Sequence, residues 1–243
     1  MKRVLLLCGV LVSACMTGSP PSEDDAGSDE PADYDVDPDD GKGDGISATF
    51  DRHNVIGESL FENSGNMTVE EVQAFFEDSP YNNRSWLADY EINGVSAAQA
   101  IIDAAEAENI HPLMLLTRMQ VEASLVSKTV KPSKSRLDRA LGCGCPDGHD
   151  CASQYLGFDK QLTCGAKILR KWYDASVDGT GQWQRGVTRR TLDPTSVTPA
   201  NHATASLYQY TPWVLPYRGG NWLVWNVTRK YVRHAEAAGY ITE

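Results

Sequence analysis

The chain has 243 residues, a formal net charge of −11 and six cysteines. Eleven acidic residues fall within residues 16–45, whereas residues 46–243 carry 22 acidic and 19 basic side chains. The nearly neutral part has no basic excess, which argues against nucleic-acid binding, and its roughly 195 residues suffice for one domain with its own core.

The N-terminus, MKRVLLLCGVLVSAC, has the pattern of an exported protein. Lys2 and Arg3 precede an apolar run, residues 4–12, that is too short to span a membrane as a mature helix. We therefore predict a signal peptide over residues 1–14. The sequence VSAC resembles a bacterial lipobox, so Cys15 is the expected lipidation site. The alternative is an ordinary signal peptide with an incidental cysteine.

Residues 15–47 are expected to form a lipid anchor and an acidic disordered linker. The acidic residues are accompanied by proline and glycine, so this segment has too little apolar surface to offset its chain entropy. Calcium binding by the aspartates is an alternative, although a calcium site needs a fixed loop. Met16 stands where an aspartate is associated with inner-membrane retention. We therefore expect a protein of the cell envelope, anchored more readily in the outer membrane and facing the periplasm or the exterior.

Two amphipathic patterns predict the first helices. Thr68 and Glu71 form a capping box ahead of apolar residues at helical spacing, and Pro80 stops that helix. Ser96 caps a second, alanine-rich helix that ends at Asn109.

A third helix, PLMLLTRMQVEASL, carries a carboxylate near its C-terminal end. Pro112 opens it, and Glu122 lies on or beside the face formed by Leu115 and Met119. Apolar neighbours and the helix macrodipole both favour the protonated form, so we expect a raised pKa for Glu122 and a role as proton donor. The alternative is an ion pair with Arg118, four residues earlier, which favours the ionised form.

The second half predicts three more helices. One covers about residues 158–174, one begins with Thr198 as cap and Pro199 at its first position, and the last closes at Gly239. Residues 176–198 are rich in turn formers and have room for a short hairpin. The domain is therefore expected to be mainly α.

Four cysteines lie in the segment CGCPDGHDCASQYLGFDKQLTC. An even number in an exported chain predicts two disulfides, and Cys143 and Cys145 are too close in sequence to pair with each other. Two pairings stay open: Cys143 with Cys151 and Cys145 with Cys164, or Cys143 with Cys164 and Cys145 with Cys151. The alternative is a zinc site that includes His149, but the spacing fits no common zinc finger. We expect no metal and no cofactor.

Four segments in order resemble secreted bacterial proteins of the lysozyme-like superfamily: FDRHNVIGESLFENSGNMTVEEVQAFF, HPLMLLTRMQVEASLV, GCGCPDGHDCASQYLGFDKQ and NHATASLYQYTPWV. This group includes lytic transglycosylases and glucosaminidase-like peptidoglycan hydrolases. The resemblance covers about residues 48–232. It implies a lysozyme-like helical domain over residues 48–243 with a disulfide-stapled loop.

The resemblance also implies roles for single residues. Glu122 matches the general acid at the end of a core helix, and Ser124 matches the serine that follows it. The further matches are to segments that line the sugar groove or face the acid: Gly157, Gln161, Tyr208 and Tyr210. Related secreted members keep cysteines matching Cys145 and Cys151, which implies that bridge and leaves Cys143 to pair with Cys164.

The implied activity is cleavage of peptidoglycan glycan strands by a monomer held at the membrane through its lipid. No second carboxylate lies near Glu122 in sequence, although Asp147, Asp150 and Asp159 in the cysteine segment are candidates. One acid fits the lytic transglycosylase scheme, in which the N-acetyl group and 6-hydroxyl of the substrate complete the reaction and Glu122 serves as acid and then base. The alternative is a non-catalytic lysozyme-like lipoprotein that binds wall glycan or a protein partner.

Two further groups of residues have competing interpretations. His202 and Ser206 lie four apart on one helix without the turn that presents a nucleophile, so a hydrolase triad is not favoured. Tyr208, Tyr210 and Trp213 have the chemistry to stack on sugars, and core packing is the alternative for each of them.

Overall fold

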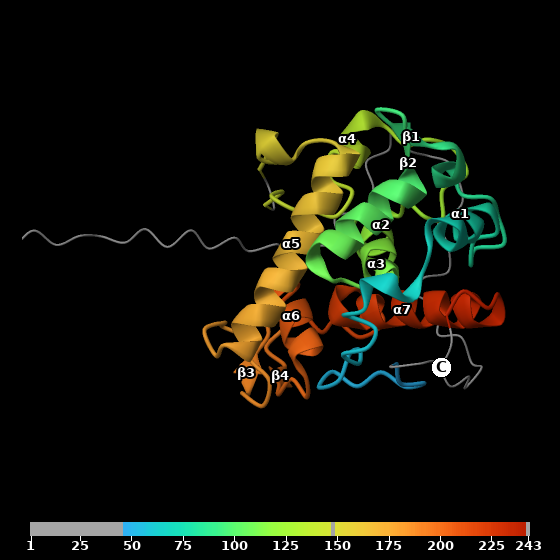
Figure 1. Ribbon diagram of the computed structural model, residues 1–243. Helices are drawn as coiled ribbons and strands as arrows, with labels where there is room; N and C mark the ends of the chain where they lie inside the picture. The colour runs from blue at the N-terminus through green and yellow to red at the C-terminus, as the bar shows by residue number, and fades with distance from the viewer. Residues whose placement is uncertain (1–45, 147–148, 242–243) are drawn as a thin grey trace, which may run out of the picture.

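The computed structural model describes residues 46–146 and 149–241 (Figure 1). The predicted signal peptide, Cys15, nearly all of the acidic linker and Asp147 lie outside the described residues. The described part is mainly helical, as expected, with seven α-helices and two small antiparallel sheets. None of its helices combines the length and the hydropathy that crossing a membrane requires.

The helices are, in chain order, α1 (Val69–Glu77), α2 (Ala97–Glu108), α3 (Pro112–Ala123), α4 (Lys134–Leu137), α5 (Phe158–Val177), α6 (His202–Tyr210) and α7 (Gly220–Ala237). The two hairpins pair β1 (Glu91–Ile92) with β2 (Val95–Ser96), and β3 (Arg189–Arg190) with β4 (Ser196–Val197). Short 3-10 turns cover Ser64–Asn66, Trp86–Asp89 and Ser153–Tyr155. The hairpin expected within residues 176–198 is therefore present.

The capping signals read from the sequence act as predicted at the first two helices. The Thr68 hydroxyl accepts from the Glu71 amide at 3.2 Å, and the Glu71 carboxylate accepts from the Thr68 amide at 2.7 Å. The Ser96 hydroxyl accepts from the Gln99 amide at 3.1 Å. Asn109 ends α2 in a left-handed conformation with φ 47°.

The predicted start of the helix that was expected to begin with Thr198 as cap and Pro199 at its first position was wrong. Helix α6 begins at His202, and its cap is Asn201, whose side-chain oxygen accepts from the Thr204 amide at 2.7 Å. The side-chain Nδ2 of Asn201 also donates to the carbonyl of Ile56 at 2.7 Å. Asn201 caps the helix, and the same side chain joins the helix start to the N-terminal part of the domain. Thr198 lies in the chain before the first turn of the helix.

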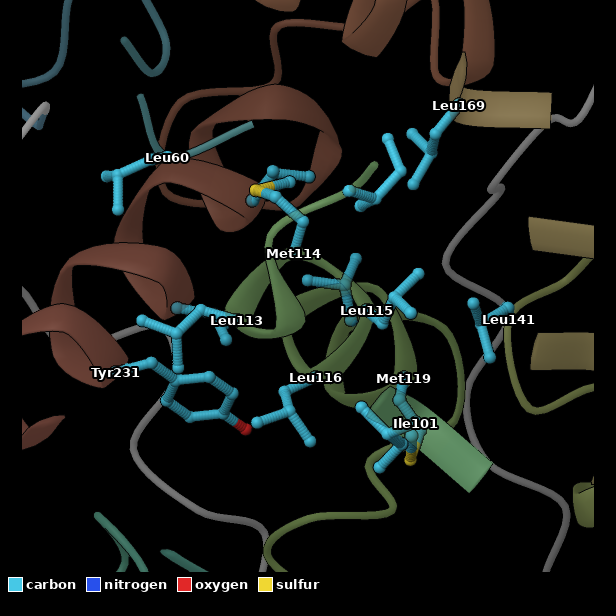
Figure 2. Packing of buried hydrophobic residues seen from close by; sticks show 14 of the residues in the cluster. Leu60, Ile101, Leu113, Met114, Leu115, Leu116, Met119, Leu141, Leu169 and Tyr231 are labelled. Carbon is cyan, nitrogen blue, oxygen red and sulfur yellow. The ribbon is translucent and has the colours of Figure 1, made fainter. Parts of the chain in front are cut away.

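Helix α3 is the centre of the core. Eleven of its twelve residues are buried, and it packs against α7, α2 and α5. Figure 2 shows Leu115, Leu116 and Met119 among side chains from other elements, such as Leu141 and Tyr231. A helix that is apolar on nearly all sides must be buried, and each such side chain contributes about 1.5–3 kcal/mol. Side chains at the end of α3 are therefore carried on a rigid support.

The segment before α1 is attached to α5 by a cluster of polar side chains. Both Nη atoms of Arg170 lie 2.9 Å from Glu62 Oε1, and the Tyr173 hydroxyl donates to Glu62 Oε2 at 3.0 Å. The guanidinium of Arg170 also lies over the Tyr173 ring, 4.5 Å from its centroid. These contacts hold the segment before α1 against α5.

Candidate functional site

Glu122 occupies the last turn of α3, and its side chain is only 9% exposed. Its Oε1 accepts a hydrogen bond from Nη2 of Arg118, which is completely buried. The ion pair considered as the alternative interpretation is thus present. It argues against the expectation that apolar neighbours and the helix macrodipole keep Glu122 protonated, because a neighbouring guanidinium favours the carboxylate over the acid.

The helix end next to Glu122 is built from backbone contacts. Ser124 ends α3 in a left-handed conformation with φ 50°, and its amide donates to Gln120 at 2.8 Å. Arg136 donates from Nη1 to the carbonyl of Ala123 at 3.2 Å, which places a cation where the helix macrodipole is negative. Ser124 is half-buried and directly follows the turn that carries the carboxylate.

Arg118 lies between Glu122 and an aromatic ring of α6. Its guanidinium carbon is 4.2 Å from the centroid of the Tyr210 ring. Among the described residues, Nε and Nη1 of Arg118 have no hydrogen-bond partner. Burial raises the pKa of the Tyr210 hydroxyl, although Arg118 opposes that shift, so the hydroxyl stays a donor. It donates to the carbonyl of Leu141 at 2.6 Å.

The residue after Leu141 approaches the carboxylate of Glu122. Gly142 has φ +69°, and a Cβ built on it would lie 2.8 Å from Glu122 Oε2. A side chain at this position would be strained by the left-handed conformation and would displace the Glu122 carboxylate. The loop backbone therefore forms one wall beside the carboxylate.

Gln161 holds that loop in place. It is completely buried, and its Oε1 accepts from the amides of Leu141 and Cys143 at 3.2 and 3.1 Å. Its Nε2 donates to the carbonyls of Cys143 and Tyr155 at 2.8 and 2.9 Å. Both ends of the amide are occupied by backbone, so Gln161 positions the loop instead of contacting a ligand. Gly157, the other residue matched to the groove, precedes α5 with φ 112°.

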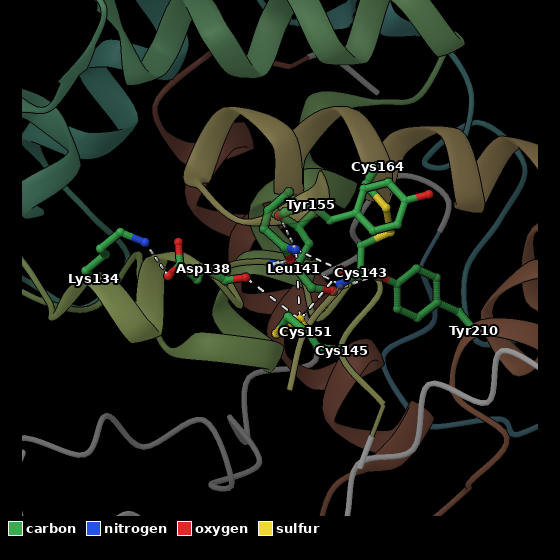
Figure 3. The surroundings of a disulfide bond; sticks show 10 residues. Lys134, Asp138, Leu141, Cys143, Cys145, Cys151, Tyr155, Cys164 and Tyr210 are labelled. Atoms are coloured by element: carbon green, nitrogen blue, oxygen red, sulfur yellow. Dashed lines mark hydrogen bonds and ion pairs between the residues drawn. A yellow bond between two sulfur atoms is a disulfide. The ribbon is translucent and has the colours of Figure 1, made fainter. Parts of the chain in front are cut away.

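Two disulfides strengthen the same loop (Figure 3). Cys143 is joined to Cys164 on α5, with 5.9 Å between their Cα atoms, and Cys145 is joined to Cys151, with 4.0 Å. This is the pairing that the resemblance implies. Bonded cysteines are not thiolate ligands, so the zinc alternative is wrong for these residues.

The two tyrosines matched to the aromatic segment have different surroundings. Tyr210 reaches Arg118, as described above. Tyr208 is completely buried and stacks on Trp183, with 5.0 Å between ring centroids. Burial raises the pKa of its hydroxyl, with Asp193 adding to the shift. Tyr208 therefore belongs to the core beside the β3–β4 hairpin, and Trp213 is half-buried in the chain that follows α6.

The candidate triad does not assemble. His202 Nδ1 lies 2.9 Å from the hydroxyl of Ser176, and the hydroxyl of Ser206 donates to the carbonyl of Leu169 at 2.8 Å. Each of the two residues is thus engaged with a different partner.

The described candidates for a second carboxylate lie apart from this arrangement or on the surface. Asp159 lines a pocket of about 310 Å³ with Asp103, Glu108 and residues of β1, β2 and α2, and Glu122 is not in that lining. Asp150 is exposed. The site is thus centred on one carboxylate, with Arg118, Tyr210 and the Gly142 backbone around it.

No protein-family model, curated protein or solved structure matches this chain significantly. The resemblance to lysozyme-like proteins therefore stays a prediction from the four sequence segments.

Proposed function

We propose that the protein has a lysozyme-like helical domain that cleaves peptidoglycan glycan strands as a lytic transglycosylase, with Glu122 as its single catalytic carboxyl group. The observation that carries the proposal is the placement of Glu122. Its carboxylate lies at the end of the central helix, α3, next to the loop that carries Gly142. Two disulfides and Gln161 hold this loop in place. A glycosidase needs such a rigidly held carboxyl group at the scissile bond.

The reaction requires two proton transfers by this group. Protonated Glu122 gives its proton to the glycosidic oxygen while the bond to C1 breaks, and the N-acetyl group of the same sugar stabilises the cation. The resulting carboxylate then removes the proton of the 6-hydroxyl as that oxygen attacks C1, which forms a 1,6-anhydro end and returns the proton to Glu122. Arg118 stabilises the carboxylate between the two transfers.

The other residues support this centre in different ways. Tyr210 and Gln161 position the loop through Leu141 and Cys143. Ser124, beside the carboxylate, is the candidate for direct contact with the sugar. A lipid on Cys15 and the acidic linker would hold the domain, as a monomer, within reach of the wall in the cell envelope.

Zymography with purified peptidoglycan tests the proposal. We expect clearing by the wild type and loss of clearing by Glu122→Gln, once circular dichroism shows that both proteins are folded. Glu62→Gln is the matched control, because it removes a carboxylate from an arginine–tyrosine cluster that shares no residue with the site. Anhydro ends in the product masses identify a transglycosylase, and reducing ends identify a hydrolase. Equal clearing by Glu122→Gln removes Glu122 from the chemistry.

A second candidate function is non-catalytic binding of wall glycan. The ion pair with Arg118 favours it, because that pair already satisfies the carboxylate without a substrate. Co-sedimentation with insoluble peptidoglycan, without release of soluble fragments by any variant, would identify a binding module.

A further inference from the structure

Arg118 links the three parts of the candidate site. It hydrogen-bonds the Glu122 carboxylate on its own helix and lies against the Tyr210 ring on α6. Tyr210 in turn donates to Leu141, the residue directly before Gly142. The Arg118 guanidinium thus contacts the Glu122 carboxylate directly and is connected through Tyr210 to the loop that carries Gly142.

The charge of Arg118 acts where water is largely excluded. Its side chain is completely buried, and that of Glu122 is 9% exposed. Arg136, bonded to the carbonyl of Ala123, and the hydroxyl of Tyr210 also lie at this place. A cation next to a carboxylate acts strongly in a medium of low polarity, and it favours the ionised form.

We propose that Arg118 is a positioning residue that holds the Glu122 carboxylate against the Gly142 loop and sets the pH at which Glu122 takes up the proton it donates. The inference rests on the proposed function, because it concerns the acid of that reaction. The paired carboxylate is ionised in the resting protein. The donor form is therefore the minor one at neutral pH, and cleavage becomes faster as the pH falls.

Two features of Arg118 are separable by substitution. Arg118→Lys keeps the positive charge but loses the planar group that lies on the Tyr210 ring. Arg118→Met keeps the length and removes the charge. We expect Arg118→Met to raise the titration midpoint of Glu122 by more than one pH unit, since an opposite charge at this range shifts a carboxyl group by about 1–3 units. Arg118→Lys should leave the midpoint within about half a unit and lower the rate at least tenfold.

The experiment uses the full chain labelled with ¹³C at the glutamate carboxyl carbons. The Glu122 resonance, assigned by its absence in Glu122→Gln, is titrated in the wild type, Arg118→Lys and Arg118→Met. The pH dependence of peptidoglycan clearing is measured on the same proteins. Tyr210→Phe is the structural control, since it keeps the ring and loses the hydrogen bond to Leu141. It should lower the rate without moving the pH profile.

The outcomes are distinguishable from failure of the proposed function. An unchanged midpoint in folded Arg118→Met overturns the inference, whether or not the wild type cleaves peptidoglycan. A raised midpoint with no cleavage by the wild type overturns the proposed function and supports the effect of Arg118 on the charge of Glu122. If Arg118→Met does not fold, Arg118→Lys decides: a moved midpoint or an undiminished rate contradicts the inference.

Discussion

The molecule contains two clusters of the same composition, each with an arginine, a glutamate and a tyrosine: the site cluster of Arg118, Glu122 and Tyr210, and the clamp cluster of Arg170, Glu62 and Tyr173. In both, the guanidinium carbon lies over the tyrosine ring, at 4.2 and 4.5 Å from the centroid. The clusters differ in their contact with water. The arginine and the glutamate are 0% and 9% exposed in the site cluster, against 18% and 35% in the clamp cluster.

Under the proposed function, this difference separates a structural ion pair from a catalytic one. Arg170 in the clamp cluster also reaches Asp174 and the carbonyl of Asn109, so its charge is shared among several acceptors and water, although its Nε has no partner among the described residues. Arg118 in the site cluster has a single carboxylate, and two of its nitrogen atoms are without partners among the described residues. A small perturbation should therefore have a large effect at the site cluster and a small one at the clamp cluster.

The largest expected effect comes from deleting one carboxylate in each cluster. Glu122→Ala leaves the Arg118 charge buried and unpaired, so it should lower the free energy of unfolding by about 3–5 kcal/mol. Glu62→Ala removes a partly hydrated partner and should lower it by about 1 kcal/mol or less. Urea unfolding of both variants at pH 7 measures the two values. Similar losses for the two variants would contradict the comparison.

A double substitution sharpens this result. Arg118→Met with Glu122→Leu removes both charges together, so most of the loss caused by Glu122→Ala should be recovered. A double variant as unstable as Glu122→Ala would mean that the packing of these side chains, and not the unpaired charge, determines the stability of the site cluster.

The next largest effect concerns the other end of α3. His111 caps this helix, is completely buried, and accepts from the Leu113 amide through Nδ1 at 3.1 Å. Burial lowers its pKa to about 4. Because this value is below the ordinary one of about 6.5, only the unfolded chain takes up a proton as the pH falls from about 6.5 to 4. Stability should thus fall by about 3 kcal/mol across that window and be unaffected by this group above it.

His111→Asn provides the test, because asparagine keeps a capping oxygen and does not titrate. Urea unfolding at pH 7, 5.5 and 4.5 should show a smaller loss of stability in His111→Asn than in the wild type. Parallel curves for the two proteins would exclude His111 as the source of acid sensitivity. The comparison also separates acid unfolding from any pH dependence of cleavage that arises at Glu122.

The mainly helical character of the domain was predictable because most of its helices carry local signals. The capping box of Thr68 with Glu71 and the proline at the start of α3 act within one turn of the chain. The start of α6 was missed because Asn201 owes part of its advantage as a cap to Ile56, which lies far away in sequence. The short helix α4 and the β1–β2 hairpin carry too few residues to show a period.

The candidate site was predictable only in part, for a similar reason. The position of Glu122 at the end of a buried helix follows from the helical period, and so does the i, i+4 spacing of Arg118. The stacking of Arg118 on Tyr210 and the approach of Gly142 to the carboxylate join segments that are distant in sequence. No local sequence pattern predicts such contacts. Gln161 was matched to the sugar groove, yet its amide is occupied by the backbone of the disulfide loop.

The smallest effects are expected from removing one hydroxyl in each cluster. Burial raises the pKa of both hydroxyls, so both are protonated donors at neutral pH. Tyr210→Phe leaves the buried carbonyl of Leu141 without its donor and should lower the free energy of unfolding by about 1–2 kcal/mol. Tyr173→Phe should lower it by less, about 0.5 kcal/mol, because water and Arg170 continue to solvate Glu62.

Tyr210→Phe and Tyr173→Phe should differ more in activity than in stability. Tyr210→Phe loosens the loop that carries Gly142, so clearing of peptidoglycan should fall several-fold while the fold stays intact. Tyr173→Phe touches no part of the site and should clear at the wild-type rate. Thermal unfolding and zymography on the same preparations measure both quantities. If the two variants lost activity in proportion to their stability, the site cluster would be a second structural clamp, and the difference in burial between the clusters would have no consequence for function.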